Sequence, residues 1–256
     1  MPCSDLAADV WLLAPGDVDP ALGLALLDDA ERARAARLAG DRRTSFVAAR
    51  ALLRSVVGTR LGCRPQDAGL AVRCPVCGGA DHGPVAVVAV GGVRLGEAAP
   101  HVSISRTGPR IAVALASRPV GVDVVSVADV ARSPFDDVAL APAEVEALAS
   151  LTGEPLHEAR ARAWARKEAA LKALGTGLTT DPRTVDVRDV AARAPAGDWV
   201  VIADAHSAPG EAAAVAVALG EHHPRSWPPG GILRLDVAVH GSSAQMTRAR
   251  ARPRGD

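Results

Sequence analysis

Two stretches of the sequence decide its fold, VGVDVV at 120–125 and WARKEAALKALGTGL at 164–178. In the first, strand alternation puts Gly121 and Asp123 on one face and only valines on the other. Because both faces are otherwise apolar, we expect a strand that is buried on both sides. A buried carboxylate needs a cation, so either a buried Arg or Lys or a divalent metal ion should lie beside Asp123.

The second stretch has the apolar spacing of an amphipathic helix, beginning after Pro155 and ending at Gly175. Glu168 lies at the edge of the apolar stripe, and Lys172 follows four residues later on the same side. Charged residues at such an edge either face a cleft or reach into solvent. The spacing alone therefore fits a functional site and also an ordinary helix with one Glu–Lys pair.

The rest of the chain mixes helical and strand patterns. Helices are expected over 20–40, 44–61, 142–151 and 155–174, and strands over 85–90, 101–105, 111–116, 120–125, 184–188, 199–203 and 213–219. Residues 62–84 are rich in Gly, Pro and Cys and predict a loop. Residues 221–256 predict a flexible tail with one stray strand over 232–239. This mixture indicates an α+β fold.

Composition excludes several functional classes. The 256 residues carry 29 basic and 29 acidic side chains, 48% apolar residues and only 2% aromatic residues without Tyr. Neutral charge and scarce aromatics argue against a nucleic-acid partner. The absence of a long apolar run or a secretory signal favours a cytoplasmic protein without a membrane segment. A basic block over 31–64 and an acidic block over 123–158 fit either a polyanion site and a metal site, or two solvated helices that pair with each other.

Taken together, the motifs resemble those of a known enzyme family. GVDV at 121–124, followed about 40 residues later by WARKEAALKALGTGL, resembles the signature of Sfp-type 4'-phosphopantetheinyl transferases. HVSISRTG at 101–108 resembles the Ser-His-Ser strand of that family, and the segment with Arg34, Phe46 and Arg50 resembles its N-terminal part. The likeness covers about residues 20–220.

The resemblance implies a fold, a reaction and partners. The fold is a pseudo-dimer of two similar α+β halves with an active-site cleft between them. A coenzyme-binding half at 1–117 and a catalytic half at 118–220 would precede the tail at 221–256. The enzyme, a monomer, transfers 4'-phosphopantetheine from coenzyme A to a serine of an acyl- or peptidyl-carrier domain with Mg²⁺, releasing 3',5'-ADP. The carriers belong to polyketide, nonribosomal-peptide or fatty-acid synthases, which places the protein in secondary-metabolite biosynthesis or carrier activation. The alternative is a non-catalytic protein of this fold that binds coenzyme A or a carrier domain.

The resemblance also assigns roles to single residues. Asp123 and Glu168 match the metal ligands, Glu168 also matches the base that deprotonates the carrier serine, and Lys172 matches the lysine on the pyrophosphate, with Lys167 assisting. The residues expected on the phosphates of coenzyme A are Arg34, Ser103, Ser105, Arg106 and Lys172.

This sequence departs from the family pattern at two positions. Val125 replaces a second strand carboxylate, so the metal loses a ligand that water could replace. Ile104 replaces the histidine of the Ser-His-Ser strand, and Arg106, on the same strand face, could substitute for it. An enzyme with a weakened site is therefore a further interpretation.

The cysteine-containing loop reads CPVCGGADH at 74–82. Cys74, Cys77 and His82 have the spacing of three zinc ligands. The position expected for a fourth ligand holds Val87, although Cys63 could complete the set. Because a structural zinc site needs four ligands, we interpret this segment as a coenzyme-contacting loop with reduced thiols. It also lacks the lysine of the family's Gly-Lys-Pro pattern, since Gly83 and Pro84 are followed by Val85.

Overall fold

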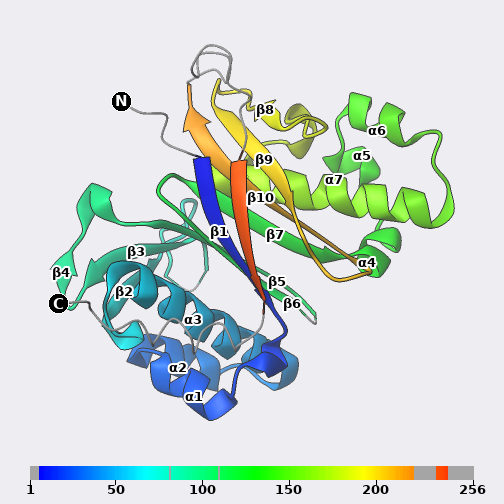
Figure 1. Cartoon of the computed structure of the whole chain (residues 1–256). Coiled ribbons are helices and arrows are strands. Elements are labelled where there is room, and N and C mark those ends of the chain that lie inside the picture. Colours follow the sequence, from blue (N-terminus) through cyan, green and yellow to red (C-terminus); the bar gives the residue numbers. More distant parts are fainter. Residues whose placement is uncertain (1–5, 81, 109, 222–234, 242–256) are drawn as a thin grey trace. The chain divides into compact units, whose positions relative to one another are not determined.

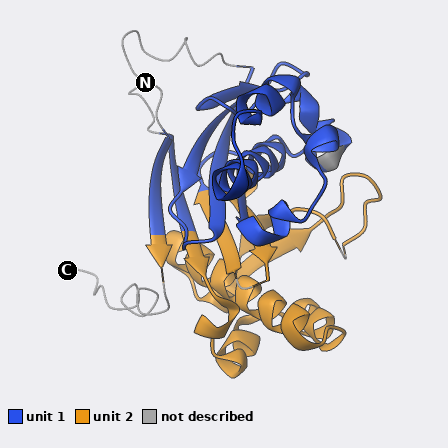
Figure 2. Ribbon diagram, turned by 90° about the vertical axis from the view of Figure 1, so that its right-hand side faces the viewer, with its two compact units in different colours: residues 1–10, 116–239 blue, residues 11–115, 240–256 orange. Residues whose placement is uncertain are grey.

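The chain has a mixed α+β fold, as its sequence predicts (Figure 1). The computed structural model describes residues 6–80, 82–108, 110–221 and 235–241. These divide into two compact units, one of residues 1–10 and 116–239 and one of residues 11–115 and 240–256 (Figure 2). The expected halves at 1–117 and 118–220, and their internal similarity, stay predictions. Most of the expected tail lies outside the described residues, and within it β11 spans Leu235–Gly241.

The first unit is built on an antiparallel sheet. Its strand order is β7 (Val120–Ser126), β10 (Glu211–Gly220), β9 (Trp199–Ala205) and β8 (Ala191–Arg193). Helix α7 (Gly153–Leu174) packs against β7 and β10. Its buried face is rich in alanine, including Ala165, Ala169 and Ala170, so its backbone can approach the sheet closely. Three short helices, α4 (Val127–Ala131), α5 (Asp136–Ala139) and α6 (Pro142–Leu148), complete this unit.

Gly121 makes the contact between α7 and β7 possible. A Cβ at this position would lie 2.5 Å from the amide nitrogen of Ala173, 2.8 Å from Cβ of Lys172, and closer still to the carbonyl oxygen of Ala169. Distances below 3.0 Å are essentially never seen for a real Cβ atom. The glycine before Asp123 therefore lets the backbone of α7 lie directly on the strand.

The second unit contains the N-terminal helices and two sheets. Its helices are α1 (Pro20–Leu26), α2 (Asp29–Ala36) and α3 (Gly40–Leu61). Its strands include β2 (Ala68–Val72), β3 (Val85–Val90) and β4 (Val93–Arg94), in the order β2-β3-β4. It also holds β5 (His101–Thr107) and most of β6 (Arg110–Ala116), from the sheet of order β11-β1-β6-β5, where β1 is Leu6–Leu13. Helix α3 supplies Leu52, Leu53 and Val57 to the core.

Three expected elements differ from the observed ones. The helix expected over 20–40 is two helices, because Asp28 accepts from the Glu31 amide 2.8 Å away and so begins a new helix. The loop expected over 62–84 contains β2. The strand expected over 184–188 is wrong, because Asp181 and Asp186 accept hydrogen bonds from the backbone two residues on and turn the chain.

None of the helices in the described ranges has the length and apolar character needed to cross a membrane.

Candidate functional site

Asp123 lies in the middle of β7 and is 5% exposed. The cation that its burial demands is Lys172 on α7, whose Nζ lies 2.6 Å from Asp123 Oδ1. The same ammonium donates to the carbonyl oxygen of Val122 at 3.1 Å. Of the two cations left open by the sequence, the structure thus provides a lysine directly. Gly121 contributes by allowing the backbone at Lys172 to approach the strand.

Glu168, one helical turn before Lys172, belongs to the same group. Its side chain is half-buried, and burial raises the pKa of its carboxyl group. The charge of Asp123 raises this pKa further, while the ammonium of Lys172 lowers it. The two carboxyl groups therefore share one electrostatic environment, and the structure brings together the three residues singled out in the two sequence motifs.

This donor set fits a divalent cation such as Mg²⁺. Two carboxyl groups lie near one ammonium, which forms an ion pair with Asp123 and lowers the pKa of Glu168. Mg²⁺ is bound in proteins by one or two carboxylates together with water and phosphate oxygens. Val125, which replaces an acid of the family pattern, is 9% exposed and packs in the core of this unit, so it offers no ligand.

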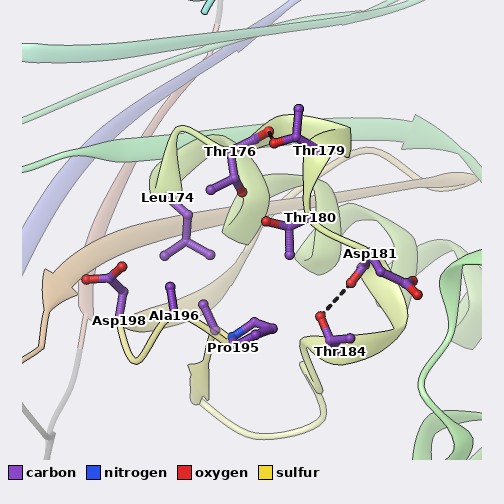
Figure 3. Close-up of a pocket in the computed structure, with 10 residues that line it drawn as sticks. Leu174, Thr176, Thr179, Thr180, Asp181, Thr184, Pro195, Ala196 and Asp198 are labelled. Atoms are coloured by element: carbon purple, nitrogen blue, oxygen red, sulfur yellow. Dashed lines mark hydrogen bonds between the residues drawn. The ribbon is translucent and has the colours of Figure 1, made fainter. Parts of the chain in front are cut away.

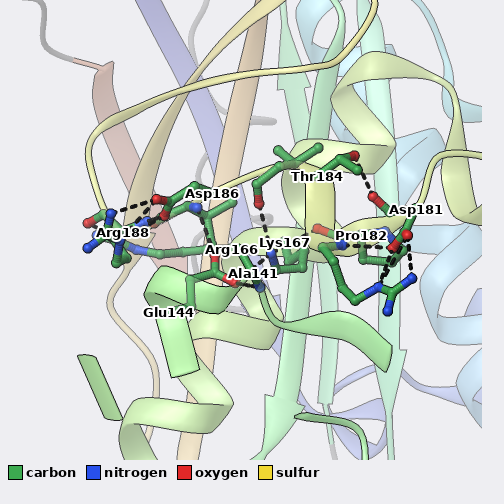
Figure 4. Close-up of polar contacts among 12 residues, drawn as sticks. Ala141, Glu144, Arg166, Lys167, Asp181, Pro182, Thr184, Asp186 and Arg188 are labelled. Atoms are coloured by element: carbon green, nitrogen blue, oxygen red, sulfur yellow. Dashed lines mark hydrogen bonds and ion pairs between the residues drawn. The ribbon is translucent and has the colours of Figure 1, made fainter. Parts of the chain in front are cut away.

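Lys167 makes its polar contacts elsewhere, with Glu144 and the segment that follows α7 (Figure 4). Its side chain is fully buried, and its Nζ lies 2.7 Å from Glu144 Oε2. It also donates to the carbonyl oxygens of Pro182 at 3.0 Å and Val185 at 2.7 Å. Glu144 in turn accepts from the amide of Val187. These contacts tie α7 to α6 and to the loop after the helix, so we assign Lys167 a packing role.

The second unit carries a cluster of arginines. The guanidinium carbons of Arg34, Arg50 and Arg106 lie 5.0, 5.7 and 5.9 Å from the centre of the Phe46 ring. Burial lowers the pKa of Arg50. The charge of Glu31 raises this pKa, and the charges of Arg34 and Arg106 lower it. Such a concentration of positive charge around one ring suits a multiply charged anion.

Arg50 is the residue of this cluster that has no assigned role in the sequence analysis. It is 8% exposed, and its Nη1 has no hydrogen-bond partner among the described residues. An orphaned buried donor of this kind costs free energy unless a ligand satisfies it. The signal that could have identified it is its spacing of four residues after Phe46, which puts both side chains on one face of α3.

Ser103 and Ser105 lie on the other face of the strand that carries Arg106. Both serines are 7% exposed, whereas Arg106 is exposed, in keeping with the alternation along β5. Arg34 and Arg106 are thus brought together, and the two serines are separated from them. Ile104 shares the face of Arg106 and packs at the edge of the α3 core.

A separate hollow lies beyond the C-terminal end of α7 (Figure 3). Its volume is about 310 Å³, and Thr176, Thr180, Asp181 and Pro195 are among its lining residues. None of the three clustered residues of β7 and α7 lines it. It therefore takes no part in the arrangement described above.

The chain is similar to a protein family and to a solved structure. The sequence model of the 4'-phosphopantetheinyl transferase superfamily matches residues 119–218, which include all three clustered residues. Among solved structures, the chain is similar to a holo-(acyl-carrier-protein) synthase from Bacillus anthracis in complex with CoA (3',5'-ADP). The identity is 24% and the TM-score 0.36, over 39% of this chain and 94% of the synthase. No curated protein matches the chain.

Proposed function

We propose that this chain is a 4'-phosphopantetheinyl transferase that moves phosphopantetheine from coenzyme A to a carrier-domain serine, depends on Mg²⁺ and releases 3',5'-ADP. The observation that carries the proposal is the convergence of Asp123, Glu168 and Lys172 within the stretch matched by the superfamily model. The carriers we propose are those of polyketide, nonribosomal-peptide or fatty-acid synthases. We further propose that the enzyme acts as a cytoplasmic monomer.

In this proposal Asp123 and Glu168 hold the Mg²⁺, which supplies charge neutralisation for the pyrophosphate of coenzyme A. Glu168 accepts the proton of the carrier serine. Its raised pKa makes it a stronger base than an exposed carboxylate, and general bases work best when their pKa approaches the working pH. The serine oxygen forms a bond to the phosphorus of phosphopantetheine, and the bond from that phosphorus to the bridging oxygen of the diphosphate breaks. Lys172 stabilises the negative charge that develops on this oxygen, which leaves with 3',5'-ADP. Asp123 keeps its ammonium in place through the 2.6 Å ion pair.

The arginine cluster of the second unit is our proposed site for the phosphates of coenzyme A. Arg34 and Arg106 contribute charge, and Arg50 contributes a desolvated guanidinium with an unused donor. Guanidinium groups bind phosphate oxygens through paired hydrogen bonds. Ser103 and Ser105, on the opposite face of β5, support the strand in this proposal and do not contact phosphate.

The decisive experiment incubates the full chain with an apo carrier domain, coenzyme A and Mg²⁺, and follows the carrier by intact-protein mass spectrometry. The carrier should gain the mass of one phosphopantetheine, and the gain should depend on Mg²⁺. Glu168→Gln should abolish the gain, while Glu158→Gln, an exposed glutamate on the same helix, should leave it unchanged. Binding of coenzyme A without any mass gain would instead support the non-catalytic alternative.

A further inference from the structure

The loop between β2 and β3 brings three metal-binding side chains together. The donor atoms of Cys74, Cys77 and His82 all lie within 4.8 Å of one another. Cys77 Sγ lies 3.4 Å from His82 Nε2. Cys74 is 7% exposed, whereas Cys77 and His82 are exposed. The cluster thus has a buried side and a side open to solvent.

The backbone of this loop points both sulfur atoms towards one place. The amides of Val76 and Cys77 donate to the sulfur of Cys74, and the amide of Gly79 donates to Cys77 Sγ at 3.4 Å. The turn closes through Cys74 N to Gly79 O at 2.8 Å and Gly78 N to Cys74 O at 2.9 Å. Gly78, with φ of 72°, adopts the left-handed conformation that this turn requires. Amide donors around a sulfur stabilise a thiolate, the form of cysteine that binds metal.

We propose that Cys74, Cys77 and His82 bind one Zn²⁺ ion, with a water molecule as the fourth ligand. Tetrahedral zinc places two thiolate sulfurs about 3.8 Å apart, and a sulfur and an imidazole nitrogen about 3.6 Å apart. The donor atoms already lie near these separations, so small side-chain rotations complete the site. The two negative charges of the thiolates offset the two positive charges of Zn²⁺, and the imidazole stays neutral.

The convergence of the donors changes the interpretation that the sequence alone favours. Without a fourth protein ligand, the spacing predicts reduced loop thiols. In the folded chain the three donor atoms instead lie close together, and backbone amides already donate hydrogen bonds to the sulfurs. Cys63 is not a member of the group. An open fourth position is compatible with zinc, since sites with three protein ligands and one water are well known.

The metal would fix the loop that connects the two strands of a β-hairpin. The ligands lie between Val72, the last residue of β2, and Val85, the first of β3. Gly83 sits against the backbone opposite, where a Cβ would lie 2.6 Å from the carbonyl oxygen of Arg73. Ion binding should therefore protect the amides of this loop from hydrogen exchange, without altering the sheet itself.

The test measures metal content in the untagged full chain purified under reducing conditions with added ZnCl₂ and then dialysed. Elemental mass spectrometry should find about one zinc per chain. Cys74→Ser and Cys77→Ser should reduce the content to background, and His82→Ala should raise the dissociation constant at least about tenfold. The matched controls Cys63→Ser and Cys3→Ser should keep one zinc. Circular dichroism of each variant separates loss of metal from loss of fold.

Cobalt provides a second readout that is independent of activity. Co²⁺ added to the metal-free chain should give thiolate-to-cobalt charge-transfer absorption and intense ligand-field bands of a tetrahedral site, both lost in Cys77→Ser. The proposal is overturned if the reduced wild-type chain retains no zinc, or if Cys63→Ser or Cys3→Ser loses it. It is also overturned if Cys74 and Cys77 form a disulfide that persists under the reducing conditions of purification.

Discussion

Replacing Gly121 with alanine should damage both stability and activity. The added Cβ would come within 2.5 Å of the Ala173 amide nitrogen and 2.8 Å of Lys172 Cβ, against an ordinary contact of at least 3.4 Å. The obstructing atoms are mainly backbone, so α7 has to move away from β7 by roughly 1 Å, as in other overpacked cores. Overpacking of this kind costs about 1–3 kcal/mol, and we expect the free energy of unfolding to fall by about 3 kcal/mol.

The displacement also changes the site. Lys172 would lose its 2.6 Å contact with Asp123, and a misplacement of this size can lower the transfer rate by about 100-fold. Urea unfolding followed by circular dichroism measures the first effect, and the carrier mass assay measures the second. Gly16→Ala is the control, because a Cβ there meets nothing within 4 Å, and its stability should change by less than about 1 kcal/mol. A Gly121→Ala chain within about 0.5 kcal/mol of wild type would refute the close contact of α7 with β7.

Three further predictions concern single side chains. Burial raises the pKa of Glu168, so the stability that its carboxyl group contributes is full in acid and is lost as the pH rises through the folded-state pKa. We therefore expect Glu168→Gln, measured in EDTA, to have a higher free energy of unfolding than wild type, with a difference that grows from acid to neutral pH. A difference between the two chains that stays constant with pH, measured by urea unfolding, would contradict this. Lys167→Ala leaves Glu144, 2% exposed, without its cation, so unfolding should become easier by about 3–5 kcal/mol. The double variant Lys167→Ala with Glu144→Gln should recover part of that loss. Free-energy changes that simply add those of the two single variants would argue against the pair. Arg50→Met should weaken binding of 3',5'-ADP in calorimetry by about 10–100-fold through loss of a charged hydrogen bond. It should also lower stability, because Glu31 loses its 3.7 Å contact with Arg50. Unchanged affinity would remove Arg50 from the anion site.

Much of the fold follows from local patterns in the sequence. The strand over 111–116 and the helix that ends at Leu174 appear where alternation and the Gly175 cap predict them. The failures have local causes too. The helix expected over 20–40 is interrupted because Asp28 caps a new helix. The periodicity of apolar residues does not show where a side chain can form such a cap. The short strand β2 was missed because its apolar residues are embedded among Gly, Pro and Cys, which dominate a composition-based reading.

The candidate site was predictable in part, for a physical reason. Asp123, Glu168 and Lys172 stood out because a charge on a buried strand or at the edge of an apolar stripe needs an explanation. The partner of Lys167 could not be foreseen, because Glu144 lies 23 positions earlier in the chain. The position of Arg50 beside the other arginines likewise depends on tertiary packing.

The gathering of Arg34, Arg50 and Arg106 around Phe46 has a thermodynamic consequence. Like charges held this close repel one another, and this repulsion lowers the stability of the ligand-free chain. Dissolved salt weakens the repulsion by screening the charges. A bound polyanion reduces the repulsion more than salt does. Because the anion binds only the folded chain, its binding stabilises the fold. The melting temperature should accordingly rise with the concentration of such an anion, so that the protein is most stable when the anion is abundant.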